Sequence, residues 1–224
     1  MNKSISLNKQ VKPLVEQLIE SHEKLNLSIS ESEGGAKIID AGIKTTGCLE
    51  AGRIITEICM GGLGTVSLSM TNNTPNWPLS IHVHSTDPVL SCLGSQYAGW
   101  SLSFVQNDDN FSALGSGPCR ALAGKEEIFK DIEYEDKFFS TVVVLEVDQN
   151  PPQEIIDKIL NDCSISEKNL TVILTPTRSL CGTTQVVGRV LEVGLHKVHE
   201  LGFPIDKVRD GFGSAPLPPP APDF

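Results

Sequence analysis

Residues 141–174 decide the fold, and they read TVVVLEVDQNPPQEIIDKILNDCSISEKNLTVIL. The run 141–145 is continuously apolar and β-branched, as in a strand that is covered on both faces. Residues 151–163 carry isoleucine and leucine at helical spacing, and 170–174 is a second apolar run. Strand, helix and strand at this spacing predict a right-handed βαβ unit with parallel strands. The fold class is therefore α/β.

The same patterns place further elements on both sides of this unit. Glycine turns, alternating residues and three- or four-residue periods delimit them. Helices are expected at 11–25, 50–60, from 88 onward and at 183–201, and strands at 36–43, 65–70, 79–84 and 100–105. We expect two α/β lobes, the first over residues 1–130 and the second over 131–224.

Composition and charge exclude several classes of protein. The 224 residues hold 18 Lys and Arg against 28 Asp and Glu, a net charge of −10, so the basic footprint of a nucleic-acid-binding protein is missing. No apolar run approaches the ~18 residues that a membrane helix needs. The six cysteines form no C-x-x-C pair, which favours free thiols in a reducing compartment. We expect a cytoplasmic protein with neither nucleic acid nor membrane as partner.

A polar segment follows the last predicted strand, where α/β sheets bind their ligands. Residues 175–182 read TPTRSLCG and hold hydroxyls, an arginine and a helix entry that suits an anion. A ligand loop and an ordinary capped connection explain this segment equally well.

The helix predicted after this loop carries a polar stripe. Gln185, Arg189, Glu192, His196 and His199 recur at steps of four and three, so they share one face. The stripe is either a solvated surface with a weak ion pair or the wall of a cleft. In a cleft, a carboxylate held by an arginine could act as a general base on water.

Three other segments are candidates for a binding or metal function. Residues 113–120, ALGSGPCR, could hold an anion on backbone N–H groups or could form a tight turn. His82 and His84 share a strand face without a suitably spaced third ligand, so we expect no metal. The proline-rich residues 213–222, taken alone, suit a polyproline ligand or a stiff end.

Taken together and in order, several motifs resemble one family. They are Glu50-Ala51-Gly52-Arg53, residues 56–63 (TEICMGGL), 95–100 (SQYAGW), 113–118 (ALGSGP), the loop 176–182, Gln185 and 188–192 (GRVLE). This set, which covers essentially the whole chain, resembles the methenyltetrahydromethanopterin cyclohydrolases.

The resemblance implies a specific activity. The family hydrolyses the 5,10-methenyl bridge of tetrahydromethanopterin to the 5-formyl form, reversibly and with no metal or redox cofactor. Its members are cytoplasmic homotrimers with two α/β lobes around a deep pocket. They serve one-carbon metabolism, in methanogenesis or formaldehyde oxidation.

The resemblance also assigns residues. Glu192 and Arg189 match the family's catalytic glutamate and arginine, with Glu192 as the base on water and Arg189 orienting it. Polar residues in or beside the matched motifs are expected to bind the pterin or its tail phosphate: Glu57, Gln96, Ser116, Arg120, Ser179 and Gln185.

Two alternatives stay open, and the first of them follows from a departure from the family. Residues 210–224 resemble an internal family segment that is followed by more chain, so we expect the second lobe to be incomplete. A non-catalytic pterin-binding or assembly subunit is then one alternative. A cyclohydrolase for another folate-like carrier is the other.

Overall fold

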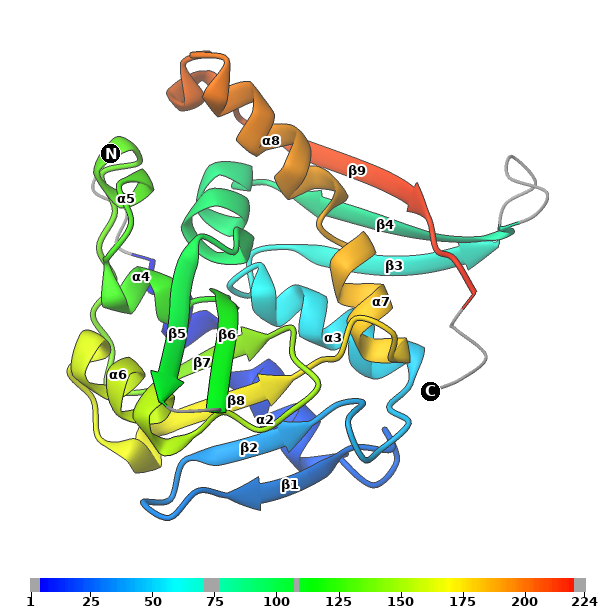
Figure 1. The fold of residues 1–224 in the computed structure, drawn as a ribbon. Coiled ribbons are helices and arrows are strands. Elements are labelled where there is room, and N and C mark those ends of the chain that lie inside the picture. The colour runs from blue at the N-terminus through cyan, green and yellow to red at the C-terminus, as the bar shows by residue number, and fades with distance from the viewer. Residues whose placement is uncertain (1–4, 71–76, 107–108, 220–224) are drawn as a thin grey trace.

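The computed structural model describes residues 5–70, 77–106 and 109–219. Its centre is a six-stranded mixed sheet in the order β1-β2-β8-β7-β6-β5 (Figure 1). β2, β8 and β7 run parallel, and the strands outside them pair antiparallel. The strands are β1 (Ser28–Glu31), β2 (Lys37–Asp40), β5 (Trp100–Gln106), β6 (Asp109–Ser116), β7 (Thr141–Leu145) and β8 (Leu170–Leu174).

The βαβ unit predicted from residues 141–174 is present. β7 leads through α6 (Gln153–Cys163) to β8, and the two strands pair in parallel with Val143 opposite Val172. Every residue of both strands is buried. The prediction of α/β architecture is thereby confirmed.

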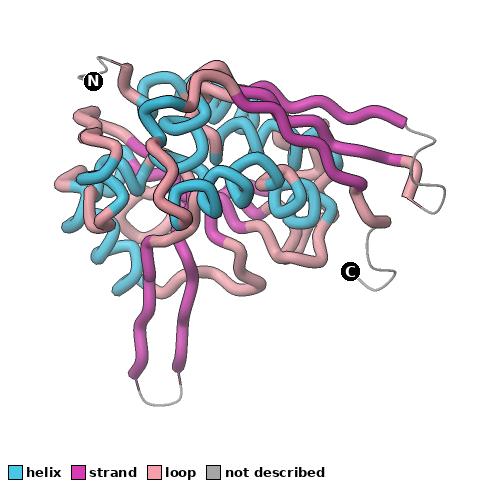
Figure 2. Tube along the Cα trace, turned by 90° about the horizontal axis from the view of Figure 1, so that it is seen from above, coloured by secondary structure: helices cyan, strands magenta, loops and turns pink. Residues whose placement is uncertain are grey.

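Alternate residues of β7 and β8 enter different cores, which explains the uninterrupted apolar runs. Val143 and Val172 pack with the isoleucines of α6 on one face. Val144 and Ile173 pack on the other face against α2 (Lys12–Glu20) and α3 (Leu49–Cys59). Figure 2 shows these layers from above, with the β5–β6 hairpin extending away from them.

A second, three-stranded antiparallel sheet has the order β3-β4-β9. Its strands are β3 (Thr65–Met70), β4 (Leu79–Ser85) and β9 (Gly211–Pro216). β9 includes the first part of the proline-rich stretch, which is therefore sheet structure; residues 220–222 lie outside the described chain. Both sheets take strands from either side of residue 130, and the predicted division into lobes stays a prediction.

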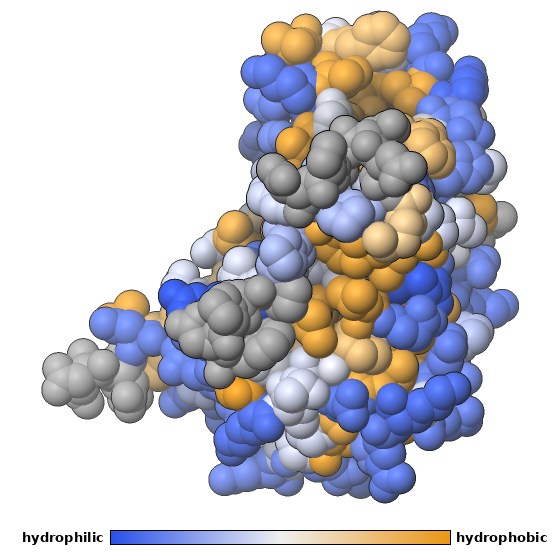
Figure 3. Space-filling view, turned by 90° about the vertical axis from the view of Figure 1, so that its right-hand side faces the viewer, coloured by the Kyte–Doolittle hydropathy of each residue, from blue (hydrophilic) through white to orange (hydrophobic). Residues whose placement is uncertain are grey.

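A third core joins this small sheet to the helices around it. Ile81 and Val83 of β4 pack with Leu93 and Leu195. Other large apolar side chains of the sheet stay exposed, such as Met70 and Phe212. Figure 3 shows the side of the molecule to the right in Figure 1, where hydrophobic residues lie at the surface between hydrophilic ones.

The prediction of one helix over 183–201 is wrong. The structure has α7 (Leu180–Val187) and α8 (Val190–Glu200), separated at Gly188 and Arg189. Arg189 N–H bonds the carbonyl of Val186, a tighter i→i−3 turn that redirects the chain. The helix predicted over 11–25 is shorter than expected, since α2 ends at Glu20 and residues 21–26 form turns; a separate short helix, α1 (Leu7–Gln10), precedes it.

The helix expected after Pro88 is a π-helix, η1 (Val89–Gln96), and it is buried from Leu90 onward. The remaining helices are short: α4 (Cys119–Ala123), α5 (Ile128–Asp131), η2 (Glu167–Asn169) and η3 (Ile205–Lys207). Within the described ranges, no helix is both long and apolar enough to span a membrane.

Replacing Gly52 by alanine should destabilise the protein. A Cβ at Gly52 would lie 2.6 Å from Thr184 Cβ and 3.1 Å from the backbone Cα of Cys181, so α3 and α7 would have to separate. We expect Gly52→Ala to lower the free energy of unfolding by about 1–3 kcal/mol, measured by urea denaturation. Gly194→Ala is the control, since a Cβ there meets no described atom within 4 Å. It should add about 0.5–1 kcal/mol through helix propensity; equal losses would contradict the argument.

Alkaline pH should destabilise the fold through its buried thiols. Burial raises the pKa of Cys59 to about 11 and the pKa values of Cys92 and Cys181 to about 12. In the unfolded chain these thiols ionise first, so stability is complete below pH ~8.5 and falls as pH rises toward the folded values.

We expect Tm to fall by several degrees between pH 8 and 10.5, measured by circular dichroism. Cys59→Ala should start less stable but lose less over the same interval. An unchanged pH slope in that variant would contradict the assignment.

Candidate active site

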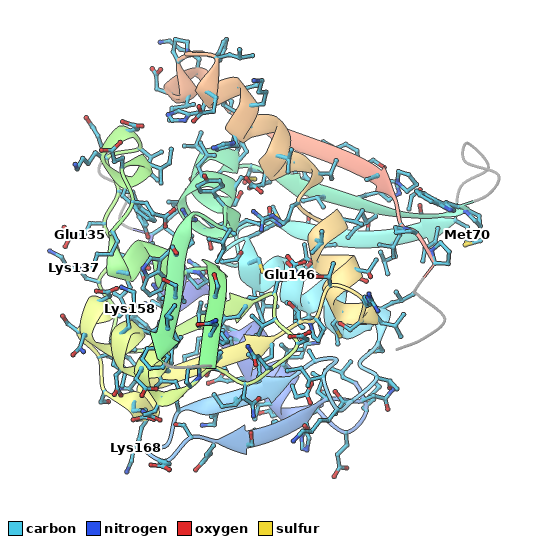
Figure 4. All side chains as sticks on the ribbon, in the orientation of Figure 1. Met70, Glu135, Lys137, Glu146, Lys158 and Lys168 are labelled. Atoms are coloured by element: carbon cyan, nitrogen blue, oxygen red, sulfur yellow. The ribbon has the colours of Figure 1, made fainter. Side chains whose placement is uncertain are left out.

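Polar residues meet at the carboxyl edge of the central strands. β7 ends at Leu145, and the end of β6 lies beside it, with Ser116 opposite Val144. A cavity of about 330 Å³ opens there. It is lined by Ala98, Ser112, Ala113, Leu114, Ser116, Val144, Glu146, Gln185 and Arg189. Figure 4 labels Glu146, which lies among the β6 strand, the loop after β7 and α7.

A second cavity of about 610 Å³ continues from the first, since Ser112 and Glu146 line both. Part of the predicted ligand loop, residues 176–179, forms one wall of this second cavity. The other wall includes Asp148 and Gln149, which follow β7. The two cavities together form one polar cleft at the position expected for ligands in an α/β sheet.

Arg189 and Glu192 form a largely buried ion pair at the first cavity. Arg189 Nε and Nη2 donate to Glu192 Oε2 at 3.0 and 2.9 Å. The Glu192 side chain is 2% exposed and that of Arg189 is 18% exposed, so the pair reaches the cavity through its arginine. The structure thus brings together the two residues predicted to be catalytic.

The polar stripe does not continue along the cavity. His196 stacks on Tyr97 with ring centroids 4.6 Å apart, and His199 contacts Asp131 at 3.2 Å. Only Gln185 and Arg189 among the stripe residues line the cavity, and they lie on either side of the break at Gly188. The expectation of one continuous face came from treating 183–201 as one helix.

Three more of the predicted binding residues lie at the cleft. Ser116 and Gln185 line the first cavity, where Gln185 Nε2 donates to Thr175 Oγ1 at 3.4 Å. Ser179 lines the second, but its hydroxyl also caps α7: it accepts from Gly182 N–H and donates to the carbonyl of Pro176. Substrate binding by these residues stays a prediction.

Gln96 lies behind the cavity wall and is fully buried. Its backbone carbonyl accepts from Ser116 Oγ at 2.7 Å, and its Nε2 donates to the carbonyl of Gly188 at 3.1 Å. Its Oε1 is buried without a hydrogen-bond partner among the described residues.

The structure does not place Glu57 and Arg120 with the others. Glu57 Oε1 accepts from Val66 N–H and pairs with Arg53 on the side of α3 that faces β3. Arg120 is 0% exposed and pairs with Glu126, while its Nη1 donates to two carbonyls of η1. Their role in substrate binding stays a prediction, and the contacts seen here are internal.

Sequence reasoning missed Glu146 and Ser112, which line both cavities. Glu146 directly follows the buried run 141–145, and this position after a parallel strand was the available signal. Ser112 gave no such signal, because its place depends on the antiparallel pairing of β6 with β5 and β7.

Two buried thiols flank this region without being reactive. Burial raises the pKa of Cys59 to about 11, although Ser116 and the charge of Arg189 oppose the shift. Burial likewise raises the pKa of Cys92 to about 12. Both are neutral thiols at physiological pH and poor nucleophiles. Among the described residues, no three His, Cys, Asp or Glu side chains form a group that could hold a metal ion.

A polar cleft at the ends of parallel strands, with an arginine at the cavity that holds a buried carboxylate, is an arrangement in which an α/β protein can bind a ligand and carry out acid–base chemistry. Comparison with known proteins narrows this class. The sequence model of the cyclohydrolase (MCH) family matches residues 6–224, so the chain belongs to this family.

Curated relatives agree with the family model. The chain is 57% identical over 219 residues to a methenyltetrahydromethanopterin cyclohydrolase of Methylobacillus flagellatus, covering 98% of this chain and 66% of the relative. A protein of the same name from Methylobacterium organophilum is 49% identical, over 98% of this chain and 68% of the relative. One from Methanospirillum hungatei is 42% identical, over 96% and 67%. The chain thus spans about two thirds of the length of these relatives.

The internal contacts of Arg120 lead us to expect that its replacement destabilises the fold. Arg120→Met would leave the carboxylate of Glu126 and the carbonyl of Leu93 without their arginine partner, while the carbonyl of Ser95 would keep its bond from Gly117 N–H. We therefore expect a loss of about 3–5 kcal/mol in the free energy of unfolding. The double variant Arg120→Met/Glu126→Leu should recover part of it. Lys158→Met, which breaks an exposed pair, is the control and should change stability by less than about 1 kcal/mol. Unchanged stability with weaker substrate binding would instead make Arg120 a substrate contact.

Proposed function

We propose that this chain carries the catalytic pair of a methenyltetrahydromethanopterin cyclohydrolase. The reaction is the reversible hydrolysis of 5,10-methenyltetrahydromethanopterin to the 5-formyl form, at a cyclic amidine C–N bond. The observation that carries the proposal is the Arg189–Glu192 pair at the cavity, in a chain that belongs to the cyclohydrolase family.

The chemistry suits these residue types. The methenyl carbon lies between two nitrogens of an amidinium cation, so it is already electrophilic and needs no metal or redox cofactor. Water adds to this carbon and loses a proton, which Glu192 accepts as general base. In the collapse of the hydrated carbon the hydroxyl loses its proton as the C=O bond forms, the bond to N10 breaks and N10 takes up a proton, which leaves the formyl group on N5.

Arg189 and Glu192 act as a unit in this scheme. Arg189 Nε and Nη2 both donate to the same oxygen of Glu192, which fixes the carboxylate. The negative charge of Glu192 also favours the substrate's cation. Low exposure strengthens these electrostatic effects, since little water screens them.

We expect other polar residues of the cleft to bind the parts of the substrate that do not react. Ser116 and Gln185 offer a hydroxyl and an amide at the first cavity, and Ser179 lies on the wall of the second. We assign the reacting ring to the cavity of about 330 Å³ beside Arg189, and the substrate's polar extension to the cavity of about 610 Å³.

From the resemblance described above we also propose a homotrimer in the cytoplasm that serves one-carbon metabolism, in methanogenesis or in formaldehyde oxidation. Two other functions remain as outcomes of the assay below. They are a pterin-binding or assembly subunit without activity, and a cyclohydrolase for another folate-like carrier.

The assay follows the loss of methenyl absorbance. Turnover of methenyltetrahydromethanopterin, but not of methenyltetrahydrofolate, supports the proposal, and the reverse preference supports the other carrier. Binding without turnover supports the non-catalytic subunit. A longer chain with the full length of the relatives is assayed beside this one, and light scattering measures the oligomeric state of both.

Glu192→Gln should abolish most of the activity. The amide keeps the shape of the side chain but cannot accept the proton, so we expect kcat to fall by about 10²–10⁴-fold. Glu200→Gln is the matched control on the same helix, since Glu200 is 57% exposed, and its kcat should stay unchanged. Near-normal turnover by folded Glu192→Gln would contradict the role of Glu192 as general base.

A further inference from the structure

The break between α7 and α8 is held by one buried amide. At a helix end, backbone carbonyls lose their helical N–H partners and need others. The carbonyl of Gly188 accepts instead from Gln96 Nε2 at 3.1 Å. Gln96 is the last residue of η1 and is 92 residues away in sequence, so the contact ties two distant elements together.

The same break is packed tightly on its other side. A Cβ at Gly188 would lie 2.5 Å from Thr56 Cγ2 on α3 and 3.2 Å from Ile81 Cδ1 on β4. Gly188 therefore lets the backbone approach both elements closely. Packing against Thr56 limits how far the chain moves inward, and the bond from Gln96 fixes the direction of the carbonyl.

The direction of the Gly188 peptide matters because Arg189 follows it. Arg189 is the residue through which the pair with Glu192 reaches the cavity. The backbone carbonyl of Gln96 also accepts from Ser116 Oγ at 2.7 Å, and Ser116 lines the same cavity. Gln96, which lies behind the cavity wall, thus holds the Ser116 hydroxyl at the end of β6 and the Gly188 carbonyl between α7 and α8.

We propose that Gln96 is a positioning residue that fixes Arg189 through the Gly188 carbonyl, rather than a substrate contact. The proposal rests on the proposed function for its kinetic test. It explains why a glutamine that does not line the cavity is fully buried with its amide nitrogen on a helix break.

Gln96→Met tests the proposal, because methionine keeps the length of the side chain but cannot donate to Gly188. We expect kcat to fall by about 10–100-fold, as for a small displacement of a catalytic group, with KM within about threefold. Gln96→Glu should behave alike, since a carboxylate has no N–H to give. A rise in KM with unchanged kcat would overturn the proposal and make Gln96 a substrate contact.

Asn8→Leu is the matched control. Asn8 is also a buried amide that donates to a backbone carbonyl, that of Pro118 at 3.0 Å, but it lies away from the cavity. We expect lower stability with kcat within about twofold. An equal loss of kcat in Asn8→Leu would overturn the proposal, because general loosening would then explain both variants.

A double-mutant cycle separates positioning from a general effect on structure. In an Arg189→Lys background, Gln96→Met should change kcat by less than about threefold, since the group it positions is already replaced. Losses that multiply fully would show that Gln96 acts independently of Arg189 and would overturn the proposal.

A spectroscopic measurement distinguishes this proposal from the proposed function. The NMR signal of the Arg189 Nε–H group is assigned by its loss in Arg189→Lys. It should broaden or shift in Gln96→Met and stay in place in Asn8→Leu. If the wild-type chain shows no turnover but this signal changes as expected, the proposed function fails and the positioning role stands. An unchanged signal overturns the positioning role whatever the turnover.

Discussion

Burial of the β7–β8 pair on both faces is the constraint on which the rest of the structure depends. Neither strand has a polar face, so helices must cover both sides of the sheet. α6 provides one layer, and α2 with α3 provides the other. A parallel pair of this kind has its only open region at the strand ends, and the polar cleft lies at the carboxyl ends.

The break between α7 and α8 places residues from both sides of it at the cavity. A continuous helix would carry Gln185 along one straight face with Arg189 and Glu192. The tighter turn at Gly188 instead places Gln185 on α7 and Arg189 at the start of α8, and both line the cavity. The histidines further along α8 contact Tyr97 and Asp131. The close approach to Thr56 requires glycine at position 188. The position of the Arg189–Glu192 pair therefore depends on Gly188 having no side chain.

The sequence predicted the elements best where local pattern and tertiary environment agree. β3, β7 and β8 have the predicted bounds, because alternation or continuous apolarity reports directly on burial. The break at Gly188 could not be predicted, since the residues around it keep helical spacing and the cause lies on α3 and η1. Likewise, sequence spacing placed Arg189 beside Glu192, but the part of the cleft formed by Ser112 depends on long-range strand pairing.

Two buried arginine–glutamate pairs show why residue type alone does not define a site. Arg120 and Glu126 lie six residues apart, and Arg189 and Glu192 lie three apart; both pairs have N–O distances below 3 Å. Arg120 is enclosed between the rings of Tyr97 and Phe129 and is 0% exposed, so its charge serves the packing of η1 and α4. Arg189 keeps 18% of its side-chain surface open at a cavity. The two pairs have the same chemistry, and they differ in that Arg120 is enclosed whereas part of the Arg189 side chain stays exposed at a cavity.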